Sequence, residues 1–159
     1  MSAEAADRPD PRGRLAELGL DLPQVVPPLA AYVPAVQSGR HVYVSGQLPL
    51  VDGQLPVTGK VGAEVPPEQA KDLARQCALN ALAAVDGLVG LERIAKIVKV
   101  TGFVASAAGF TGQPSVINGA SELFGEVLGE AGRHARSAVG VAELPMNAPV
   151  EVEVIVEIS

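Results

Sequence analysis

The end of the chain reads Arg133-His-Ala-Arg-Ser-Ala-Val-Gly-Val-Ala-Glu-Leu-Pro-Met-Asn-Ala-Pro-Val-Glu-Val-Glu-Val-Ile-Val-Glu-Ile158 and indicates two β-strands joined by a turn. The second strand carries apolar side chains at every second position, with other residues between them: Val150, Val152, Val154, Val156 and Ile158 against Glu151, Glu153, Ile155 and Glu157. This period of two is typical of a sheet buried on its valine side. The prolines and asparagine between the strands favour a turn.

The first of these strands also alternates. It places Val139 and Val141 on one face and the residues Arg136, Ala138, Gly140 and Ala142 on the other. If both valine rows face the core, Arg136 and Glu151 share the opposite face. The residues around Arg136 are too small to cover a sheet, so we expect a ligand or another subunit to cover it. A guanidinium fixed above small residues is suited to binding a carboxylate through two hydrogen bonds. A plain hairpin with solvated glutamates is the alternative, above all for Glu153 and Glu157.

The rest of the chain predicts a hairpin, a helix, a strand and a second helix before this last hairpin. These elements span residues 32–47, 66–89, 94–104 and 114–128, with prolines at the start of each helix. The order predicts an α+β fold, a two-layer sandwich with both helices on one face of the sheet. Ahead of a domain at 31–159, we expect a disordered stretch at 1–11. A short helix and a proline-rich linker are predicted for 12–30.

Composition limits the class of protein. A chain of 159 residues with a net charge of −6 fits one domain and argues against a nucleic-acid surface. The single cysteine, Cys77, excludes an internal disulfide and lies on the apolar stripe of the first long helix, where we expect a core residue rather than a nucleophile. No apolar run is long enough to span a membrane, so we expect a soluble, cytoplasmic protein.

The chain lacks the residues that several common kinds of functional site require. His41, His134 and Cys77 are too scattered for a metal site, so no metal is expected. The chain has neither a glycine-rich phosphate loop nor a G-x-S-x-G element. We expect His134 to be exposed rather than catalytic.

Two stretches resemble the recurrent motifs of the RidA (YjgF) family. They are Ser45-Gly-Gln-Leu-Pro49 and the segment 135–145 with the strand that follows it. The similarity extends from about Ala31 to Ile158. It implies a chorismate-mutase-like fold whose trimer wraps its sheets into a central barrel, with sites between subunits. It also implies hydrolytic deamination of enamine or imine acids, such as 2-aminoacrylate, to 2-keto acids and ammonia without a cofactor.

The resemblance also assigns roles to residues. It implies that Arg136 binds the substrate carboxylate, that Glu151 activates water, and that the backbone of Ala138 holds substrate or water. It places four further residues in the pocket: Tyr32, Ser45, Gly46 and Asn118. Ordinary structural roles remain open for Tyr32 as an edge aromatic, Ser45 as a strand hydroxyl and Asn118 as a surface residue of the second helix.

The chain departs from the common family pattern. Ala138 stands where a cysteine is usual, Ala31 replaces a proline, Pro34 stands where a glutamine is common, and the N-terminal part is longer. These changes mark a divergent branch. The alternative to an enzyme is a trimeric binding module for small carboxylates, which would not need Glu151. An endoribonuclease is ranked last, because the chain is acidic, has few aromatic residues and lacks a histidine pair.

Overall fold

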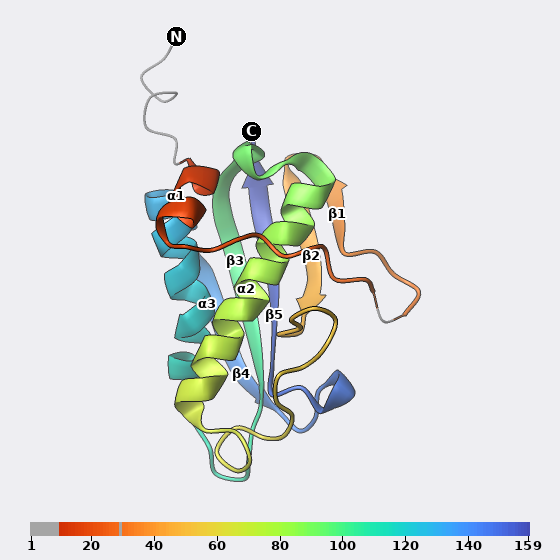
Figure 1. Cartoon of the computed structure of the whole chain (residues 1–159), viewed down its shortest axis with the longest axis vertical. Coiled ribbons are helices and arrows are strands. Elements are labelled where there is room, and N and C mark those ends of the chain that lie inside the picture. Colours follow the sequence, from red (N-terminus) through yellow and green to blue (C-terminus); the bar gives the residue numbers. More distant parts are fainter. Residues whose placement is uncertain (1–9, 29) are drawn as a thin grey trace.

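The computed structural model describes residues 10–28 and 30–159, in which one five-stranded sheet is covered on one face by two long helices (Figure 1). The predicted two-layer α+β sandwich is confirmed. The strands are β1 (Ala35–Ser38), β2 (His41–Gln47), β3 (Ile94–Ala105), β4 (Ala135–Val141) and β5 (Val150–Ile158). The helices are α1 (Pro11–Glu17), α2 (Pro67–Val89) and α3 (Gln113–Leu128), with short 3-10 turns η2 (Leu91–Arg93), η3 (Gly129–Gly132) and η4 (Pro145–Asn147). Most of the stretch predicted to be disordered lies outside the described residues.

The strands lie in the order β1-β2-β5-β3-β4. All neighbouring strands are antiparallel except β3 and β4, which are parallel and connected by the crossover through α3. The expected hairpin at the end of the chain is therefore wrong. β3 lies between β4 and β5 and pairs with both. The connection from β4 to β5 therefore crosses from one side of β3 to the other instead of forming a tight turn.

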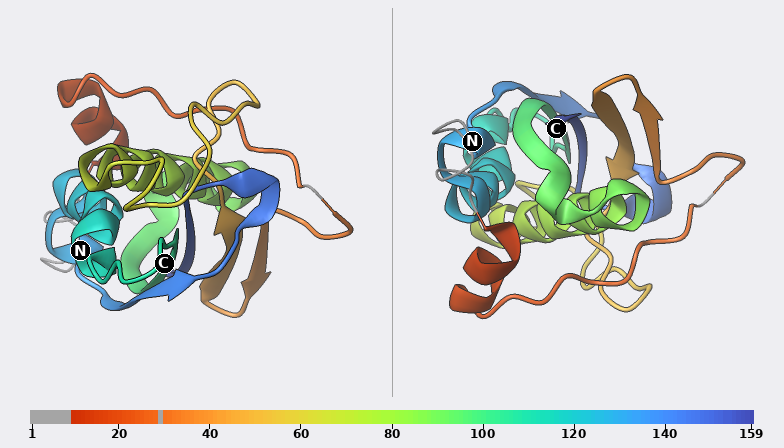
Figure 2. Two further views of the ribbon diagram at one scale, coloured as in Figure 1. Left: turned by 90° about the horizontal axis from the view of Figure 1, so that it is seen from below. Right: turned by 90° about the horizontal axis from the view of Figure 1, so that it is seen from above.

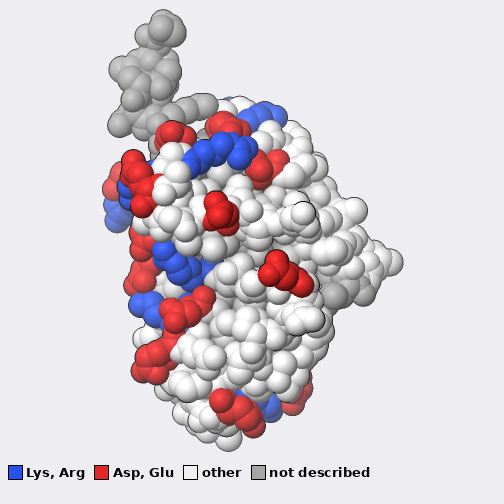
Figure 3. Space-filling model, in the orientation of Figure 1, with Lys and Arg blue, Asp and Glu red and all other residues white. Residues whose placement is uncertain are grey.

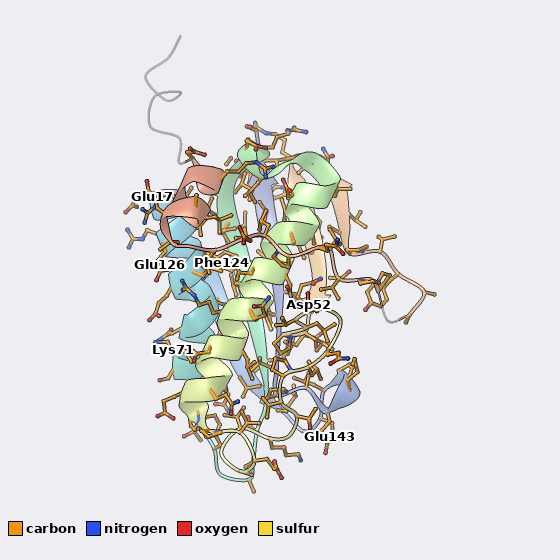
Figure 4. The ribbon with its side chains drawn as sticks, in the orientation of Figure 1. Glu17, Asp52, Lys71, Phe124, Glu126 and Glu143 are labelled. Atoms are coloured by element: carbon orange, nitrogen blue, oxygen red, sulfur yellow. The ribbon has the colours of Figure 1, made fainter. Side chains whose placement is uncertain are left out.

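The valine row of β5 forms the centre of the core. Val150, Val152 and Val156 are fully buried, and the row faces the helical layer at α2, as its alternation predicts. The two helices lie close together, since a Cβ added at Gly119 of α3 would stand 2.0 Å from the carbonyl oxygen of Lys71 on α2. On their outer side, ion pairs link Lys71 to Glu122 and Arg75 to Glu126; Figure 4 labels Lys71 and Glu126.

Residues 18–28, which follow α1, cross the outer surface of α2 as an extended strap (Figures 1 and 2). Its starting point is α1, where Asp10 caps the helix through a bond from the Gly13 amide and Leu15 is only 4% exposed. Arg12 forms ion pairs with Asp86 at the end of α2 and with Glu92 of η2. The strap is thus fixed to the helical layer before it runs toward β1.

β4 has the opposite orientation to the one that its alternation suggested. Arg136 pairs with Val100 of β3, which is fully buried under the helices, so Arg136 lies on the helix-covered face. Val139 pairs with Phe103 and is 44% exposed on the open face. Because β4 is an edge strand and only partly buried, its valine row does not identify the side that faces the core.

No helix within residues 10–28 and 30–159 is long and apolar enough to cross a membrane.

Candidate functional site

Arg136 is held by three bonds to α3. Its Nη1 donates to Asn118 Oδ1 at 2.8 Å and to Ser121 Oγ at 3.2 Å, and its Nη2 donates to the carbonyl oxygen of Pro114 at 3.3 Å. Pro114, Asn118 and Ser121 follow one another at helical spacing, so they form one stripe on α3. A guanidinium has five N–H donors. The described residues offer no acceptor for Nε–H and the second Nη2–H, which leaves two donors for a carboxylate.

A second layer fixes Ser121 itself. Its hydroxyl lies 2.9 Å from His134 Nε2, and His134 Nδ1 lies 2.6 Å from the carbonyl oxygen of Gly132. A carbonyl only accepts, so Nδ1 carries the proton, and in the neutral ring Nε2 accepts from Ser121. The expectation that His134 is exposed is wrong: it is half-buried and packs edge-on against the ring of Phe124, at 6.0 Å between centroids.

Ala138 lies beside this group on the same face of β4. It is half-buried against the core and pairs with Gly102 of β3. Gly102 is needed there, because an added Cβ would stand 2.4 Å from Ile117 of α3. β4 is the last strand of the sheet, so one edge of its backbone has no partner strand among the described residues.

Glu151 forms a separate group with Gly46 at the end of β2. The register between β2 and β5 shifts between Val44 and Gln47, and the side chain of Glu151 lies over this irregular stretch. A Cβ added at Gly46 would stand 2.2 Å from Glu151 Oε1 and 2.8 Å from its carboxyl carbon. The absence of a side chain at position 46 is therefore what makes room for the Glu151 carboxylate.

Tyr32 and Ser45 belong to this second group. The Ser45 hydroxyl donates to the carbonyl oxygen of Val33 at 2.6 Å, and the Ser45 amide donates to that of Pro34 at 2.9 Å. Ser45 thus fixes the turn before β1 rather than presenting a free hydroxyl. Tyr32 is 44% exposed and precedes β1, outside the strand predicted for it.

Tyr32, Gly46 and Glu151, but not Ser45, line a pocket of about 280 Å³ together with Gln47. The rest of the lining is apolar and comes from the strap, from the stretch before β1, from the segment after β2 and from η4: Val26, Pro27, Pro28, Ala30, Pro34, Leu48, Leu50 and Pro145. Gln47 Nε2 donates to the Ser45 carbonyl at 3.0 Å, whereas Gln47 Oε1 is buried without a hydrogen-bond partner among the described residues.

Partial burial raises the pKa of Glu151, and the neighbouring negative charge of Glu153 adds to the increase. The folded chain therefore holds this proton to a higher pH than the unfolded chain, in which a glutamate has a pKa of about 4.3. Stability is complete below that value and falls as pH rises through the folded pKa, because the partly buried carboxylate must then be ionised.

We expect Glu151→Gln to remove this loss of stability. Urea unfolding of both proteins between pH 4 and pH 8 measures the effect. The midpoint of the wild type should fall relative to that of Glu151→Gln as pH rises, and two parallel curves would show that Glu151 titrates as it does in the unfolded chain.

The structure does not bring Arg136 and Glu151 together. Val100 pairs with both Arg136 and Val154, whereas Phe103 pairs with Glu151, so the two side chains lie on opposite faces of the sheet. Their strands are separated by β3, which amounts to about 10 Å at the usual strand spacing of about 4.8 Å. The expectation that they share one face is wrong, because it depended on the orientation of β4.

Asn118 accompanies Arg136, whereas Tyr32, Ser45 and Gly46 accompany Glu151. The chain therefore carries two half-sites. We call them the arginine half-site (Arg136, Asn118, Ser121, His134 and Ala138) and the glutamate half-site (Glu151, Gly46, Tyr32 and Ser45). Ser121 was missed as a partner of Arg136, and His134 as a partner of Ser121. The spacing of Pro114, Asn118 and Ser121 on one helix face could have indicated Ser121.

Cys77 belongs to neither half-site. It is fully buried, and burial first and the charge of Glu151 second raise the pKa of its thiol well above the ordinary value. A buried thiol of this kind is not a nucleophile. Within residues 10–28 and 30–159 no group of three His, Cys, Asp or Glu side chains could hold a metal ion.

Comparison with known proteins gives consistent matches along the chain. The family model described as endoribonuclease L-PSP matches residues 23–158. Protein TCP17 of Trypanosoma cruzi is 44% identical over 147 residues, which cover 91% of this chain and 92% of that protein. The 2-iminobutanoate/2-iminopropanoate deaminase of Escherichia coli K12 is 35% identical over 127 residues, covering 80% of this chain and 87% of the relative.

A solved structure has the same fold. The crystal structure of Atu1372 from Agrobacterium tumefaciens, a protein described as having unknown function, is 50% identical and superimposes with a TM-score of 0.87. The match covers 94% of this chain and 92% of the other.

Proposed function

The chain belongs to the endoribonuclease L-PSP family, also known as the YjgF or RidA family, and from its two half-sites we propose that it hydrolyses 2-imino acids to 2-keto acids and ammonia. The observation that carries this proposal is the geometry of Arg136. Three of its donors are bonded to α3, and the remaining two are left for a substrate carboxylate. Relatives named 2-iminobutanoate/2-iminopropanoate deaminase support the same reaction.

The reaction needs only water and proton transfers. Water adds to the imine carbon and forms a carbinolamine, a proton moves to nitrogen, and the C–N bond breaks as the C=O bond forms. The iminium form plus water gives the 2-keto acid plus ammonium, so atoms and charge balance. Binding of the carboxylate by Arg136 holds the neighbouring imine carbon in one place, which favours attack by a positioned water.

Glu151 is suited to the proton transfers. Its raised pKa lies closer to physiological pH than that of an ordinary glutamate, and a general base or acid works best under that condition. Glu151 takes a proton from the attacking water and returns it to the departing nitrogen. The backbone of Ala138 and the side chain of Tyr32 are proposed to bind the substrate on either side of the reacting carbon.

One substrate cannot contact both half-sites of one chain, because Arg136 and Glu151 lie on opposite faces of the sheet. We therefore infer a homotrimer in which the arginine half-site of one subunit faces the glutamate half-site of the next. A head-to-tail interface of this kind closes into a ring with one site at each boundary.

The experiment compares wild type and Glu151→Gln in two assays, ammonia release from 2-iminopropanoate and binding of pyruvate measured by calorimetry. We expect Glu151→Gln to bind pyruvate like the wild type and to release ammonia at least about a hundredfold more slowly. Unchanged ammonia release would remove Glu151 from the reaction. Pyruvate binding by a wild type that does not accelerate ammonia release would identify a binding module instead.

We expect Ser121→Ala to raise KM for the imine by about tenfold with little change in kcat, since Arg136 loses one of two bonds at Nη1 and a bond to a charged group is worth about 1.5–3 kcal/mol. Ser121→Thr keeps the hydroxyl and should restore the wild-type KM. Equal KM values for all three proteins in steady-state assays would show that Asn118 and Pro114 alone are sufficient to hold Arg136.

Gly46→Ala tests the position of the Glu151 carboxylate without removing it. The new methyl group would overlap Glu151 Oε1, and the flexible side chain has to turn away. We expect a loss of about tenfold or more in kcat with little change in melting temperature. The matched control is Gly125→Ala on α3, where an added Cβ meets nothing within 4 Å. Full activity of Gly46→Ala would contradict the assigned geometry.

A further inference from the structure

Arg136 is held by neutral groups of α3 alone, two side chains and one backbone carbonyl. The ion pairs of α3 lie on its outer side instead, where Glu122 pairs with Lys71 and Glu126 with Arg75. In Figure 3, acidic and basic side chains gather over this side of α1 and α3. Within residues 10–28 and 30–159 no carboxylate forms an ion pair with Arg136, so its positive charge remains for an anionic ligand.

The serine among these neutral partners needs a partner of its own. A neutral group holds a guanidinium only if its lone pairs point toward it, and a hydroxyl can rotate. A serine inside a helix often donates to the carbonyl oxygen four residues earlier, which for Ser121 belongs to Ile117. Turning the side chain in that direction would move Ser121 Oγ away from Arg136 Nη1, from which it lies 3.2 Å.

His134 holds the Ser121 hydroxyl in its observed direction. Its Nε2 accepts the O–H at 2.9 Å, which leaves the lone pairs of Oγ for Arg136. The imidazole ring is itself fixed twice, by the bond from Nδ1 to the Gly132 carbonyl oxygen at 2.6 Å and by the edge-on contact with Phe124. Gly132 in turn lies against the backbone of α3, since an added Cβ would stand 2.2 Å from the carbonyl oxygen of Phe124.

On the basis of the deaminase function proposed above, we propose that His134 is a positioning residue of the arginine half-site. In its neutral form, with the proton on Nδ1, it orients the Ser121 hydroxyl, and that hydroxyl aligns Arg136 with the substrate carboxylate. Three hydrogen bonds thus connect Gly132, at the end of η3, to Arg136. His134 acts through Ser121 and therefore affects binding of the carboxylate, whereas attack by water is assigned to Glu151.

Two substitutions of His134 separate its two bonds. The amide of asparagine reaches about as far as Nδ1 and keeps a donor for Gly132, whereas the amide of glutamine reaches about as far as Nε2 and keeps an acceptor for Ser121. We expect His134→Asn to raise KM for 2-iminopropanoate about three- to tenfold with kcat nearly unchanged. His134→Gln should stay within about twofold of the wild-type KM.

The matched control is His41→Gln, which removes the second of the chain's two histidines. His41 begins β2, which β5 and β3 separate from β4. Its substitution should leave KM unchanged. Melting temperatures establish that every variant is folded.

A double-variant cycle distinguishes a positioning role from a general loss of packing. If His134 acts through Ser121, the combination of Ser121→Ala with His134→Asn has the KM of Ser121→Ala alone, whereas independent effects multiply. Multiplied effects overturn the inference and leave the deaminase function standing. The same conclusion follows if His134→Asn and His134→Gln raise KM equally.

Two measurements do not require catalysis. Nitrogen-15 NMR of the histidine rings, assigned by comparison with His41→Gln, should show the proton of neutral His134 on Nδ1, and a proton on Nε2 overturns the inference. If no imine is hydrolysed, pyruvate binding measured by calorimetry takes the place of KM. Binding weakened in His134→Asn and restored in His134→Gln supports the role of His134, and equal binding by these variants and the wild type contradicts it.

Discussion

Arg136→Ala should lower kcat/KM for imine hydrolysis by about ten- to a hundredfold or more, because the substrate carboxylate loses a charge-assisted pair worth about 1.5–3 kcal/mol. Arg136→Lys should not restore the activity, since an ammonium cannot keep the three bonds to α3 and also offer two parallel donors. Steady-state kinetics on 2-iminopropanoate measures the loss.

The control for this change is Arg133→Ala on the same segment. The side chain of Arg133 is 80% exposed and, within residues 10–28 and 30–159, forms an ion pair with Glu130 alone, so its removal should leave kcat/KM unchanged. Melting temperatures establish that both variants are folded. Wild-type activity in a folded Arg136→Ala would remove the carboxylate role from Arg136 and with it the arginine half-site.

Mixing two inactive variants should recover activity. Arg136→Ala lacks the arginine half-site and Glu151→Gln lacks a functional glutamate half-site, yet each retains the other half. If sites form between neighbouring subunits of a ring, random assembly from equal amounts gives intact halves at about one boundary in four. We therefore expect about a quarter of wild-type activity after the mixture is unfolded and refolded together, against nearly none for each variant alone.

The result depends on exchange of subunits, which native mass spectrometry of the mixture verifies. Mixed trimers without recovered activity would show that Arg136 and Glu151 act within one chain. A mass corresponding to monomers at micromolar concentration would contradict the intersubunit site directly.

The alternation of β5 was sufficient to predict a strand with a buried valine side, and the prolines ahead of α2 and α3 were sufficient to place both helices. The same reasoning failed for β4. Its alternation is compatible with either face pointing to the core, and only the pairing with β3 decides between the two orientations. Arg136 pairs with the buried Val100 and so lies on the face that α3 covers, whereas Val139 pairs with Phe103 and is exposed on the opposite face. That pairing depends on contacts distant in sequence, which periodicity does not report.

The candidate site shows the same division. The motifs indicated Arg136, Glu151 and Gly46, because each belongs to a local pattern. The bond from Ser121 to His134 and the pocket wall at Val26 arise where separate segments meet. A proline-rich stretch indicates an extended backbone, but it carries no information about the surface against which that backbone lies.

The central claim is tested most directly by ammonia release from 2-aminoacrylate. A pyridoxal-phosphate dehydratase acting on serine generates this compound in the assay, and the rate is measured with and without the wild-type protein. The account predicts a rate above the spontaneous one that rises in proportion to the protein concentration and that Arg136→Ala abolishes. A folded wild-type trimer that leaves the spontaneous rate unchanged, for this imine and for those from leucine and methionine, would contradict it.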